Sequence, residues 1–345
     1  MLVKKLEING FRNLKDFSIL FSAGKNLIFG ANGSGKTSII ESLFLLGFGK
    51  SFLPVSKKEL VNFDAGGFYL NAEVFDKSGE NRITACMEKS FTLQLNGEKT
   101  PLAHVSQYLY PLFFSHFSTG HPSDYVPFFR KVVDRFIYGL GSLYLHDVLR
   151  YNNVLKQKNS LLKNLGKPVN TSELNSWNTL LAETGCRIVK KRMAFINRLN
   201  QATAEIFGQD LKINYFPALL NAQALSEPAM RDDLERVRNS EIKARRCLLG
   251  PQRDRFEVQV AGRKLQLFSS GEKKKYLIMV YVAFIELFRQ ARNDYPVFLL
   301  DDYDAAMDER NLAFLLEHFP AMQVIATSVA KNEKFGHLFE LKKEN

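Results

Sequence analysis

Eight consecutive residues near the start of the chain have the types and spacing that bind phosphate groups. They are Gly30, Ala31, Asn32, Gly33, Ser34, Gly35, Lys36 and Thr37, and they fit the phosphate-binding loop pattern G-x-x-x-x-G-K-[ST] at every fixed position. Glycines let backbone N–H groups converge on phosphates, and a helix after the loop adds the positive end of its dipole. We expect Lys36 to act in catalysis by reaching the β- and γ-phosphates of ATP, and the Thr37 hydroxyl to bind Mg²⁺.

Two adjacent carboxylates follow an apolar run late in the chain. Residues 296–300 read P-V-F-L-L and lead directly into Asp301 and Asp302. This is the form of a Walker B element, in which a buried parallel strand delivers a carboxylate beside the glycine loop. We expect Asp301 to hold Mg²⁺, directly or through water, and Asp302 to orient or deprotonate the attacking water. A second apolar run, 323–326, ends in the hydroxyls of Thr327 and Ser328.

A third stretch, 268–272, reads F-S-S-G-E and resembles the L-S-G-G-Q signature of ABC-type ATPases. We expect Ser269 and Gly271 to lie at a helix start, where anions bind. In ABC-type ATPases the signature of one subunit contacts the γ-phosphate held by the other, so that two nucleotides are sandwiched in a head-to-tail dimer. The alternative is an ordinary serine and glycine helix cap. The position shortly before the Asp301–Asp302 strand favours the signature.

The elements around these residues predict an α/β fold. The glycine loop lies between a short apolar run at 25–29 and a helical segment at 38–46, so strand, loop and helix follow one another. Alternating apolar residues from 68 to 95 predict an antiparallel meander, followed by the hairpin turn Asn96-Gly97, because both residues tolerate positive φ. The signature stretch opens a long helix that reaches about Arg289. We therefore expect a nucleotide-binding core with a parallel or mixed sheet beside an antiparallel β subdomain.

The pattern becomes helical after about residue 112. Apolar residues recur every seven positions, at Leu174, Leu181, Ile188 and Phe195. This spacing predicts helices packed antiparallel on one another, as in a short coiled coil. We expect an inserted α-helical lobe at 113–235, between the two parts of an ATPase head at 1–112 and 236–345.

The charge of the chain favours a polyanionic partner. Its 345 residues include 47 Lys and Arg against 36 Asp and Glu, a formal net charge of +11. Nucleic acid is the simplest such partner, whereas an acidic membrane and a merely basic surface remain alternatives. We predict that Lys190, Lys191 and Arg192 of the helical lobe contact DNA. The competing interpretation is a solvated helix face.

Other features narrow the class of protein. Cys86, Cys186 and Cys247 are isolated and show no C-x-x-C spacing, which argues against a zinc site and a disulfide framework. The N-terminal residues lack the apolar core of a signal peptide, and no apolar run approaches membrane length. These patterns predict a soluble cytoplasmic protein.

Five further stretches resemble motifs of one ATPase family. They are residues 10–14 (G-F-R-N-L), 49–52 (G-K-S-F), 127–134 (P-F-F-R-K-V-V-D), 151–162 (Y-N-N-V-L-K-Q-K-N-S-L-L) and 250–254 (G-P-Q-R-D). On these stretches, and nearly from end to end, the chain resembles the RecF family of recombination mediator ATPases, which are related to SMC-type proteins. The stretch 151–162 is the most specific, because ATPases in general have no reason to carry it.

The resemblance implies an ABC-type ATPase head with a helical lobe and no long coiled coil. It implies that Arg12 contacts the nucleotide and that ATP drives a homodimer which binds DNA. It further implies a weak, DNA-stimulated ATPase whose hydrolysis step resets the dimer. The implied partners are double-stranded DNA, gapped DNA with its single-stranded region, and the proteins RecO and RecR, with which the family loads the RecA recombinase. The protein would then associate with the nucleoid when bound to DNA.

The chain also departs from the family. Gln252 stands where the family has histidine, the signature continues as E-K-K rather than Q-Q-R, and residues 305–308 read A-A-M-D in place of S-E-L-D. These departures leave open a nucleotide-switched scaffold in which hydrolysis is vestigial. An ATPase of a defence or nuclease system is disfavoured because the chain ends soon after Asp302. The helical insertion and the basic charge argue against a transporter ATPase.

Overall fold

The computed structural model describes residues 1–77, 79–115, 125–141, 143–163, 171–208, 211–221 and 225–342. The chain divides into two compact units, Met1–Gly120 with Ser269–Asn345, and His121–Phe268. These boundaries, 120/121 and 268/269, differ from those expected at 112/113 and 235/236. The first lies later in the chain because β8 (Pro111–Ser115) pairs with β12 (Val297–Asp301) of the first unit. Residues 236–268 belong to the second unit because β10 (Arg255–Val260) pairs antiparallel with β9 (Leu211–Phe216) along its whole length.

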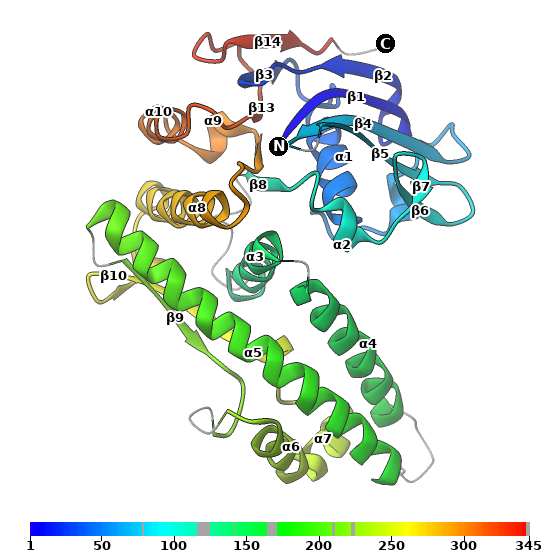
Figure 1. The fold of residues 1–345 in the computed structure, drawn as a ribbon, viewed down its shortest axis with the longest axis vertical. Helices are drawn as coiled ribbons and strands as arrows, with labels where there is room; N and C mark the ends of the chain where they lie inside the picture. The colour runs from blue at the N-terminus through cyan, green and yellow to red at the C-terminus, as the bar shows by residue number, and fades with distance from the viewer. Residues whose placement is uncertain are drawn as a thin grey trace. The chain divides into compact units, whose positions relative to one another are not determined.

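A five-stranded parallel sheet forms the centre of the first unit (Figure 1). Its order is β14 (His337–Glu340), β3 (Lys25–Phe29), β13 (Val324–Ser328), β12 (Val297–Asp301) and β8 (Pro111–Ser115). Every residue of β8, β12 and β13 is buried, as in parallel sheets covered on both faces. Phe29 pairs with Ser328 and Asp301 with Ser115, so the carboxyl ends of these strands meet at one edge.

The second sheet of this unit is antiparallel and confirms the predicted meander. Its order is β2 (Leu14–Leu20), β1 (Leu2–Phe11), β4 (Phe68–Asp76), β5 (Gly79–Met87), β6 (Phe91–Leu95) and β7 (Glu98–Lys99). Asn96 and Gly97 have φ values of 52° and 87°, which confirms the predicted turn. One sheet is therefore entirely parallel and the other entirely antiparallel. Together with the helices packed on them, they confirm the predicted α/β class.

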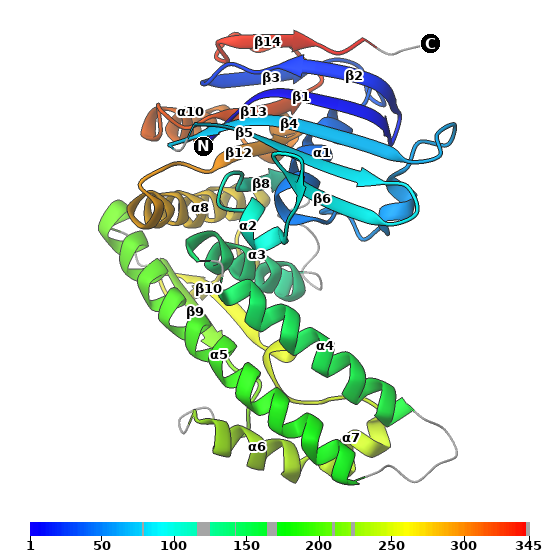
Figure 2. The ribbon, with the colours of Figure 1, turned by 45° about the vertical axis from the view of Figure 1, so that its right-hand side comes forward.

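The helix that follows the glycine loop, α1 (Lys36–Phe48), contacts strands of both sheets (Figure 2). All of its residues except Thr37 are buried. Because α1 is buried on all sides, its apolar residues are not confined to one stripe along the helix. The remaining helices of this unit are α2 (Leu102–Val105), α8 (Ser270–Arg292), α9 (Tyr303–Ala306) and α10 (Glu309–His318), with a 3-10 turn at Lys57–Leu60.

The second unit is mainly helical. Its helices are α3 (Tyr125–Leu140), α4 (Leu143–Lys163), α5 (Thr171–Phe207), α6 (Glu227–Arg236) and α7 (Arg238–Ala244), with 3-10 turns at Pro251–Arg253 and Leu265–Leu267. A small sheet joins β9, β10 and β11 (Arg263–Lys264). The four residues of the predicted seven-residue repeat are all buried on α5. Asp147 bonds Lys191 and Arg150 bonds Glu183, so α4 and α5 run antiparallel, as predicted.

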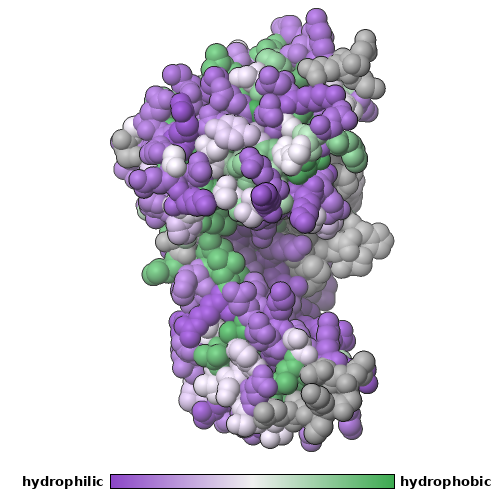
Figure 3. Space-filling model, turned by 90° about the vertical axis from the view of Figure 1, so that its right-hand side faces the viewer, coloured by the Kyte–Doolittle hydropathy of each residue, from purple (hydrophilic) through white to green (hydrophobic). Residues whose placement is uncertain are grey.

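The surface seen in Figure 3 is mostly hydrophilic, with apolar residues in small groups. Within the described part of the chain, no helix combines the length and apolar character needed to cross a membrane.

Candidate nucleotide site

The backbone of the glycine loop requires glycine at two points. Gly30 has φ 154°, and a Cβ there would lie 2.3 Å from the carbonyl oxygen of Leu341. Gly35 has φ 106°, and a Cβ there would lie 2.7 Å from Cδ2 of Leu14. Any side chain would therefore collide with its surroundings and strain the backbone. The loop is shaped by its own sequence and by the elements packed against it.

Lys36 and Thr37 begin α1 and reach in different directions. The ammonium of Lys36, whose residue is 5% exposed, donates to the carbonyl oxygens of Gly30 at 2.8 Å and Ala31 at 2.9 Å. The Thr37 hydroxyl donates to Oδ1 of Asp301 at 3.2 Å. The structure thus brings together the two residues predicted to bind the metal, which are 264 positions apart in the sequence.

One buried hydroxyl links the Asp301 carboxylate to the backbone of Asp302. Thr327 Oγ1 donates to Asp301 Oδ1 at 2.8 Å and accepts from the backbone N–H of Asp302, also at 2.8 Å. Asp302 has φ 46°, a conformation that non-glycine residues rarely adopt and that often marks functional sites. Burial raises the pKa of Asp301 to about 6, although hydrogen bonds from Thr327 and Thr37 oppose the shift. The sequence showed a strand ending in hydroxyls but gave no signal of this bridging role.

Arg12 is held beside α1 by a buried carboxylate. Its Nε donates to Oε2 of Glu41 at 2.8 Å and its Nη2 to Oε1 at 2.9 Å, and the hydrogen bond with Glu41 raises the pKa of Arg12. The next residue, Asn13, donates to the carbonyl oxygen of Gly33 at 3.2 Å and accepts from Ser38 at 2.8 Å. The turn between β1 and β2 is therefore fastened to the glycine loop. The contact of Arg12 with a nucleotide stays a prediction.

The residues of this site fit ATP with Mg²⁺. Ser34 Oγ is buried and has no hydrogen-bond partner among the described residues, and Lys36 bonds only carbonyl oxygens that a phosphate can replace. The Thr37 hydroxyl and the Asp301 carboxylate are the hard oxygen ligands that Mg²⁺ prefers. In the described chain no cluster of three or more His, Cys, Asp or Glu could hold a metal. A single carboxylate is nonetheless sufficient for Mg²⁺, which usually takes its remaining ligands from water and phosphates.

Ser269 caps α8, as the alternative interpretation expects. Its hydroxyl accepts from the backbone N–H of Glu272 at 3.4 Å, while the Glu272 carboxylate accepts from Ser269 N at 2.9 Å. Ser269 and Gly271 are both exposed, and a Cβ built on Gly271 would meet nothing within 4 Å. The cap therefore leaves this helix end accessible. The predicted contact with a partner's nucleotide stays a prediction.

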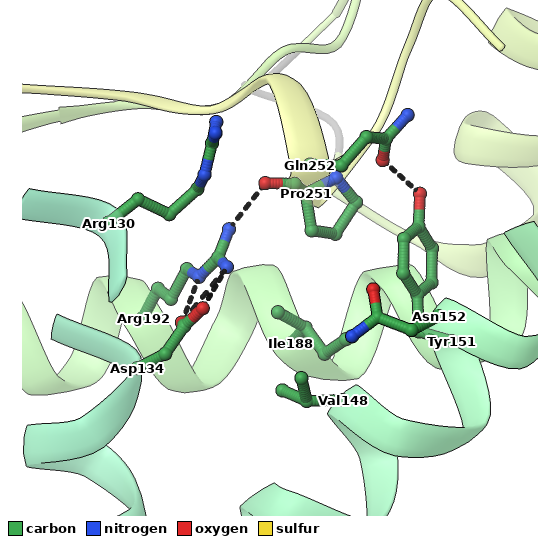
Figure 4. A pocket seen from close by; sticks show the side chains of 9 residues that line it. All are labelled: Arg130, Asp134, Val148, Tyr151, Asn152, Ile188, Arg192, Pro251 and Gln252. Atoms are coloured by element: carbon green, nitrogen blue, oxygen red, sulfur yellow. Dashed lines mark hydrogen bonds and ion pairs between the residues drawn. The ribbon is translucent and has the colours of Figure 1, made fainter. Parts of the chain in front are cut away.

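The structure corrects the predicted DNA contact of Arg192. Its guanidinium donates to Asp134 at 3.0 and 2.9 Å and to the carbonyl oxygen of Pro251 at 2.8 Å (Figure 4). It also donates to Asp254 Oδ2 at 2.6 Å. Tyr144 and Tyr215 also bond to these groups. We call Arg192, Asp134 and Asp254 the arginine cluster. Burial alone would lower the pKa of Arg192, but the two carboxylates raise it well above its usual range. Arg192 is 3% exposed and cannot face DNA.

The other two predicted DNA contacts differ from Arg192. Lys191 bonds Asp147 at 2.8 Å, and Arg187 bonds the same carboxylate at 3.0 Å, so part of this basic face is neutralised by α4. Lys190 is exposed. DNA contacts of Lys190 and Lys191 stay predictions.

The stretch 151–162 is explained by packing within the second unit. Tyr151 donates to Gln252, which joins α4 to the stretch 250–254. Lys158 and Glu241 are both fully buried and form an ion pair at 2.6 Å. Asn159 accepts from the backbone N–H of Cys247 at 2.7 Å, and burial raises the pKa of the Cys247 thiol to about 11. These side chains hold α4 against the segment that leads into β10.

Comparison with known proteins decides the family. Residues 2–337 match the family described as the RecF/RecN/SMC N terminal domain. The DNA replication and repair protein RecF of Acetivibrio thermocellus is 31% identical, over 97% of this chain and 96% of the relative. The chain belongs to the RecF family. The RecF of Carboxydothermus hydrogenoformans is 30% identical over 95% of this chain and 94% of its own.

Solved RecF structures confirm the predicted fold. The recombination mediator protein RecF-ATPrS of the RecFOR pathway has a TM-score of 0.87 and 26% identity, covering 99% of this chain and 96% of that one. RecF-ATP of the same pathway has a TM-score of 0.84 and 26% identity, covering 96% and 92%. The chain therefore has the RecF fold, an SMC- or ABC-type ATPase head with a helical lobe, and belongs to a family of ATPases that act in DNA replication and repair.

Proposed function

We propose that this RecF-family protein is an ATP-dependent DNA-binding protein of DNA repair and replication. ATP would close a homodimer on double-stranded or gapped DNA, and the protein would then help RecO and RecR to load the RecA recombinase. The observation that supports the proposal most is the placement of Thr37 beside Asp301, next to a loop with an unpartnered Ser34 hydroxyl. RecF proteins solved with ATP and assigned to the RecFOR pathway support the nucleotide and the protein partners. The protein would be cytoplasmic and nucleoid-associated when bound to DNA.

The residues have distinct roles in this proposal. Lys36 exchanges the carbonyl oxygens of Gly30 and Ala31 for the β- and γ-phosphates. Bound Mg²⁺ neutralises phosphate charge, and Thr37 and Asp301 would hold it. Asp302, fixed in its left-handed conformation through Thr327, orients the attacking water. Ser269 and Gly271 would reach the phosphates from a partner copy.

Binding of ATP and assembly would be coupled by mass action. A nucleotide that touches two subunits stabilises the dimer, because it binds the dimer more tightly than the monomer. A DNA site completed only in the dimer is then linked to ATP, and DNA must strengthen ATP binding by the same factor.

Sedimentation and DNA binding with ATP, with ADP and without nucleotide test this proposal. We expect a dimer and tight DNA binding with ATP alone, and a monomer with weak DNA binding in the other two states. Lys36→Ala should behave like the nucleotide-free protein under all three conditions. Equal sedimentation and equal DNA affinity in the three states would contradict the proposal.

A second candidate is a nucleotide-switched DNA-binding scaffold with vestigial hydrolysis. The segment 305–308 lacks the family serine, and Asp308 is used to cap α10 by accepting from Asn311 N at 2.8 Å. Phosphate release that is the same in the wild type and in Lys36→Ala would favour this scaffold over an ATPase.

A further inference from the structure

Three family-like stretches that the nucleotide site does not use meet at one pocket of the second unit. The pocket has a volume of about 140 Å³, and Figure 4 shows its lining. It takes Arg130 from the stretch 127–134, Tyr151 and Asn152 from 151–162, and Gln252 from 250–254. A site for one water needs only ~10–15 Å³, so this pocket has room for a larger polar group.

The carboxylates near the pocket are already satisfied by donors other than Arg130. Both oxygens of Asp134 accept from Arg192. Asp254 Oδ2 accepts from Arg192 and Tyr215, and its Oδ1 accepts from the backbone N–H of Ala218 at 2.9 Å. The two carboxylates of the arginine cluster are therefore paired with Arg192, Tyr215 and the backbone of Ala218, and neither forms an ion pair with Arg130.

Arg130 is left with a half-buried charge. One of its N–H groups donates to the backbone carbonyl oxygen of Asp254 at 3.0 Å, and no carboxylate of the described residues lies within ion-pair distance. In Figure 4 its guanidinium points away from Asp134. Burial lowers the pKa of Arg130, and the charges of Arg192 and Arg253 lower it further, against the opposing effect of the two carboxylates. A cation in this setting is stabilised by an anion that enters the pocket.

We propose that Arg130 and this pocket bind a phosphate of a nucleic-acid backbone. A guanidinium presents a planar fork of N–H donors that matches the oxygens of a phosphate. The exposed amide of Asn152 stands at the same pocket and can donate to a second oxygen. Such a contact fixes the position of a duplex without reading its sequence, which suits a protein with a formal charge of +11. The inference rests on the proposed function and gives the second unit a DNA contact in place of Arg192.

The salt dependence of DNA binding tests the charge of Arg130. A labelled gapped duplex is titrated with protein and ATP at several salt concentrations. Arg130→Gln should bind about 5–20-fold more weakly, and the slope of log affinity against log salt should fall by about one, the value for one lost phosphate contact. Arg130→Lys keeps the charge and should restore the slope. Lys212→Gln, which removes an exposed cation of the same unit outside the pocket, is the control.

A second pair of variants leaves Arg130 and its bond to Asp254 intact. Asn152→Glu places a negative charge at the pocket, whereas Asn153→Glu places the same charge on the neighbouring exposed residue of α4, which does not line the pocket. Asn152→Glu should weaken DNA binding about tenfold relative to Asn153→Glu.

The outcomes separate this inference from the proposed function. If the wild type binds DNA only with ATP, but Arg130→Gln and Asn152→Glu match their controls in affinity and slope, the phosphate site is overturned and the proposed function stands. If the wild type does not bind DNA with ATP, both are overturned.

Discussion

The candidate nucleotide site of the first unit and the arginine cluster of the second unit are both built from buried polar and charged side chains, yet they differ in how completely the hydrogen-bonding groups of these side chains are satisfied. Ser34 has no hydrogen-bond partner among the described residues, and the Lys36 ammonium bonds the carbonyl oxygens of Gly30 and Ala31 rather than a carboxylate. Arg192 instead meets two carboxylates and a carbonyl oxygen. Incomplete satisfaction is typical of a site that awaits a ligand, whereas a closed network fixes a shape. Buried charge alone therefore does not identify a binding site.

The largest expected effect is loss of the arginine cluster. Arg192→Ala leaves Asp134 and Asp254 without their shared partner, and breaking a buried ion pair in this way costs about 3–5 kcal/mol of unfolding free energy. Trp177, the single tryptophan of the chain, lies on α5 and reports unfolding of the second unit by its fluorescence. Arg198→Ala, an exposed arginine on the same helix, is the control and should change little. If Arg192→Ala is as stable as the wild type, the arginine cluster is not a network that stabilises the second unit.

The next effect concerns Thr327 in the first unit. Thr327→Val keeps the shape of the side chain but removes the hydroxyl that bonds Asp301 and Asp302. We expect the ATPase rate constant to fall about 10–100-fold, the usual loss when a partner of a metal ligand is removed, with a smaller change in KM. Thr327→Ser should restore most of the rate. Equal rates in the valine and serine variants would mean that the hydroxyl has no role in positioning the Asp301 carboxylate and the Asp302 backbone.

The smallest effect is a pH dependence that sharpens the contrast between the sites. The pKa of Asp301 is about 6 in the folded protein and 3.8 in its ordinary state. The folded state therefore binds this proton more readily, and the contribution of Asp301 to the free energy of unfolding should rise as pH falls from above 6 toward 4. Asp301→Asn removes the buried charge and should stabilise the nucleotide-free protein by at most about 3 kcal/mol at pH 7.5, since the pKa difference between 3.8 and about 6 corresponds to about 1.4 kcal/mol for each unit. The difference should vanish near pH 4.

Thermal melts of the wild type and of Asp301→Asn at several pH values measure this difference in stability. Asp304→Asn, a neighbouring carboxylate that is exposed, is the control for the change in net charge. An Asp301→Asn variant less stable than the wild type at pH 7.5 would show that the carboxylate is well solvated or fully paired in the folded state.

Much of the geometry of the candidate nucleotide site could be predicted from the sequence, because its parts have fixed local patterns. The glycine loop, Thr37 and Asp301 each stand next to a strand end, and parallel strands bring their carboxyl ends together. The role of Thr327 could not be predicted, because a strand that ends in a hydroxyl is common and its partners lie on β12.

The second unit shows where sequence reasoning fails. Arg192 looked like one of several cations on a polar helix face, but its partners Asp134 and Asp254 are 58 and 62 positions away. Periodicity identifies which residues face a neighbouring helix but not which long-range carboxylates meet them. The domain boundary expected at 235/236 lies instead at 268/269 for a related reason. Strand β10 pairs with β9, which precedes it by the whole of α6 and α7, so both strands belong to the second unit.

Equilibrium binding of ATP with Mg²⁺ tests the central claim most directly. The wild type should bind ATP with an affinity that depends on Mg²⁺, Lys36→Ala should lose that binding, and Arg130→Gln, which lies in the second unit, should keep it. ATP affinity that is unchanged by Lys36→Ala, or independent of Mg²⁺, would contradict the assignment of residues 30–37 and Asp301 as the nucleotide site.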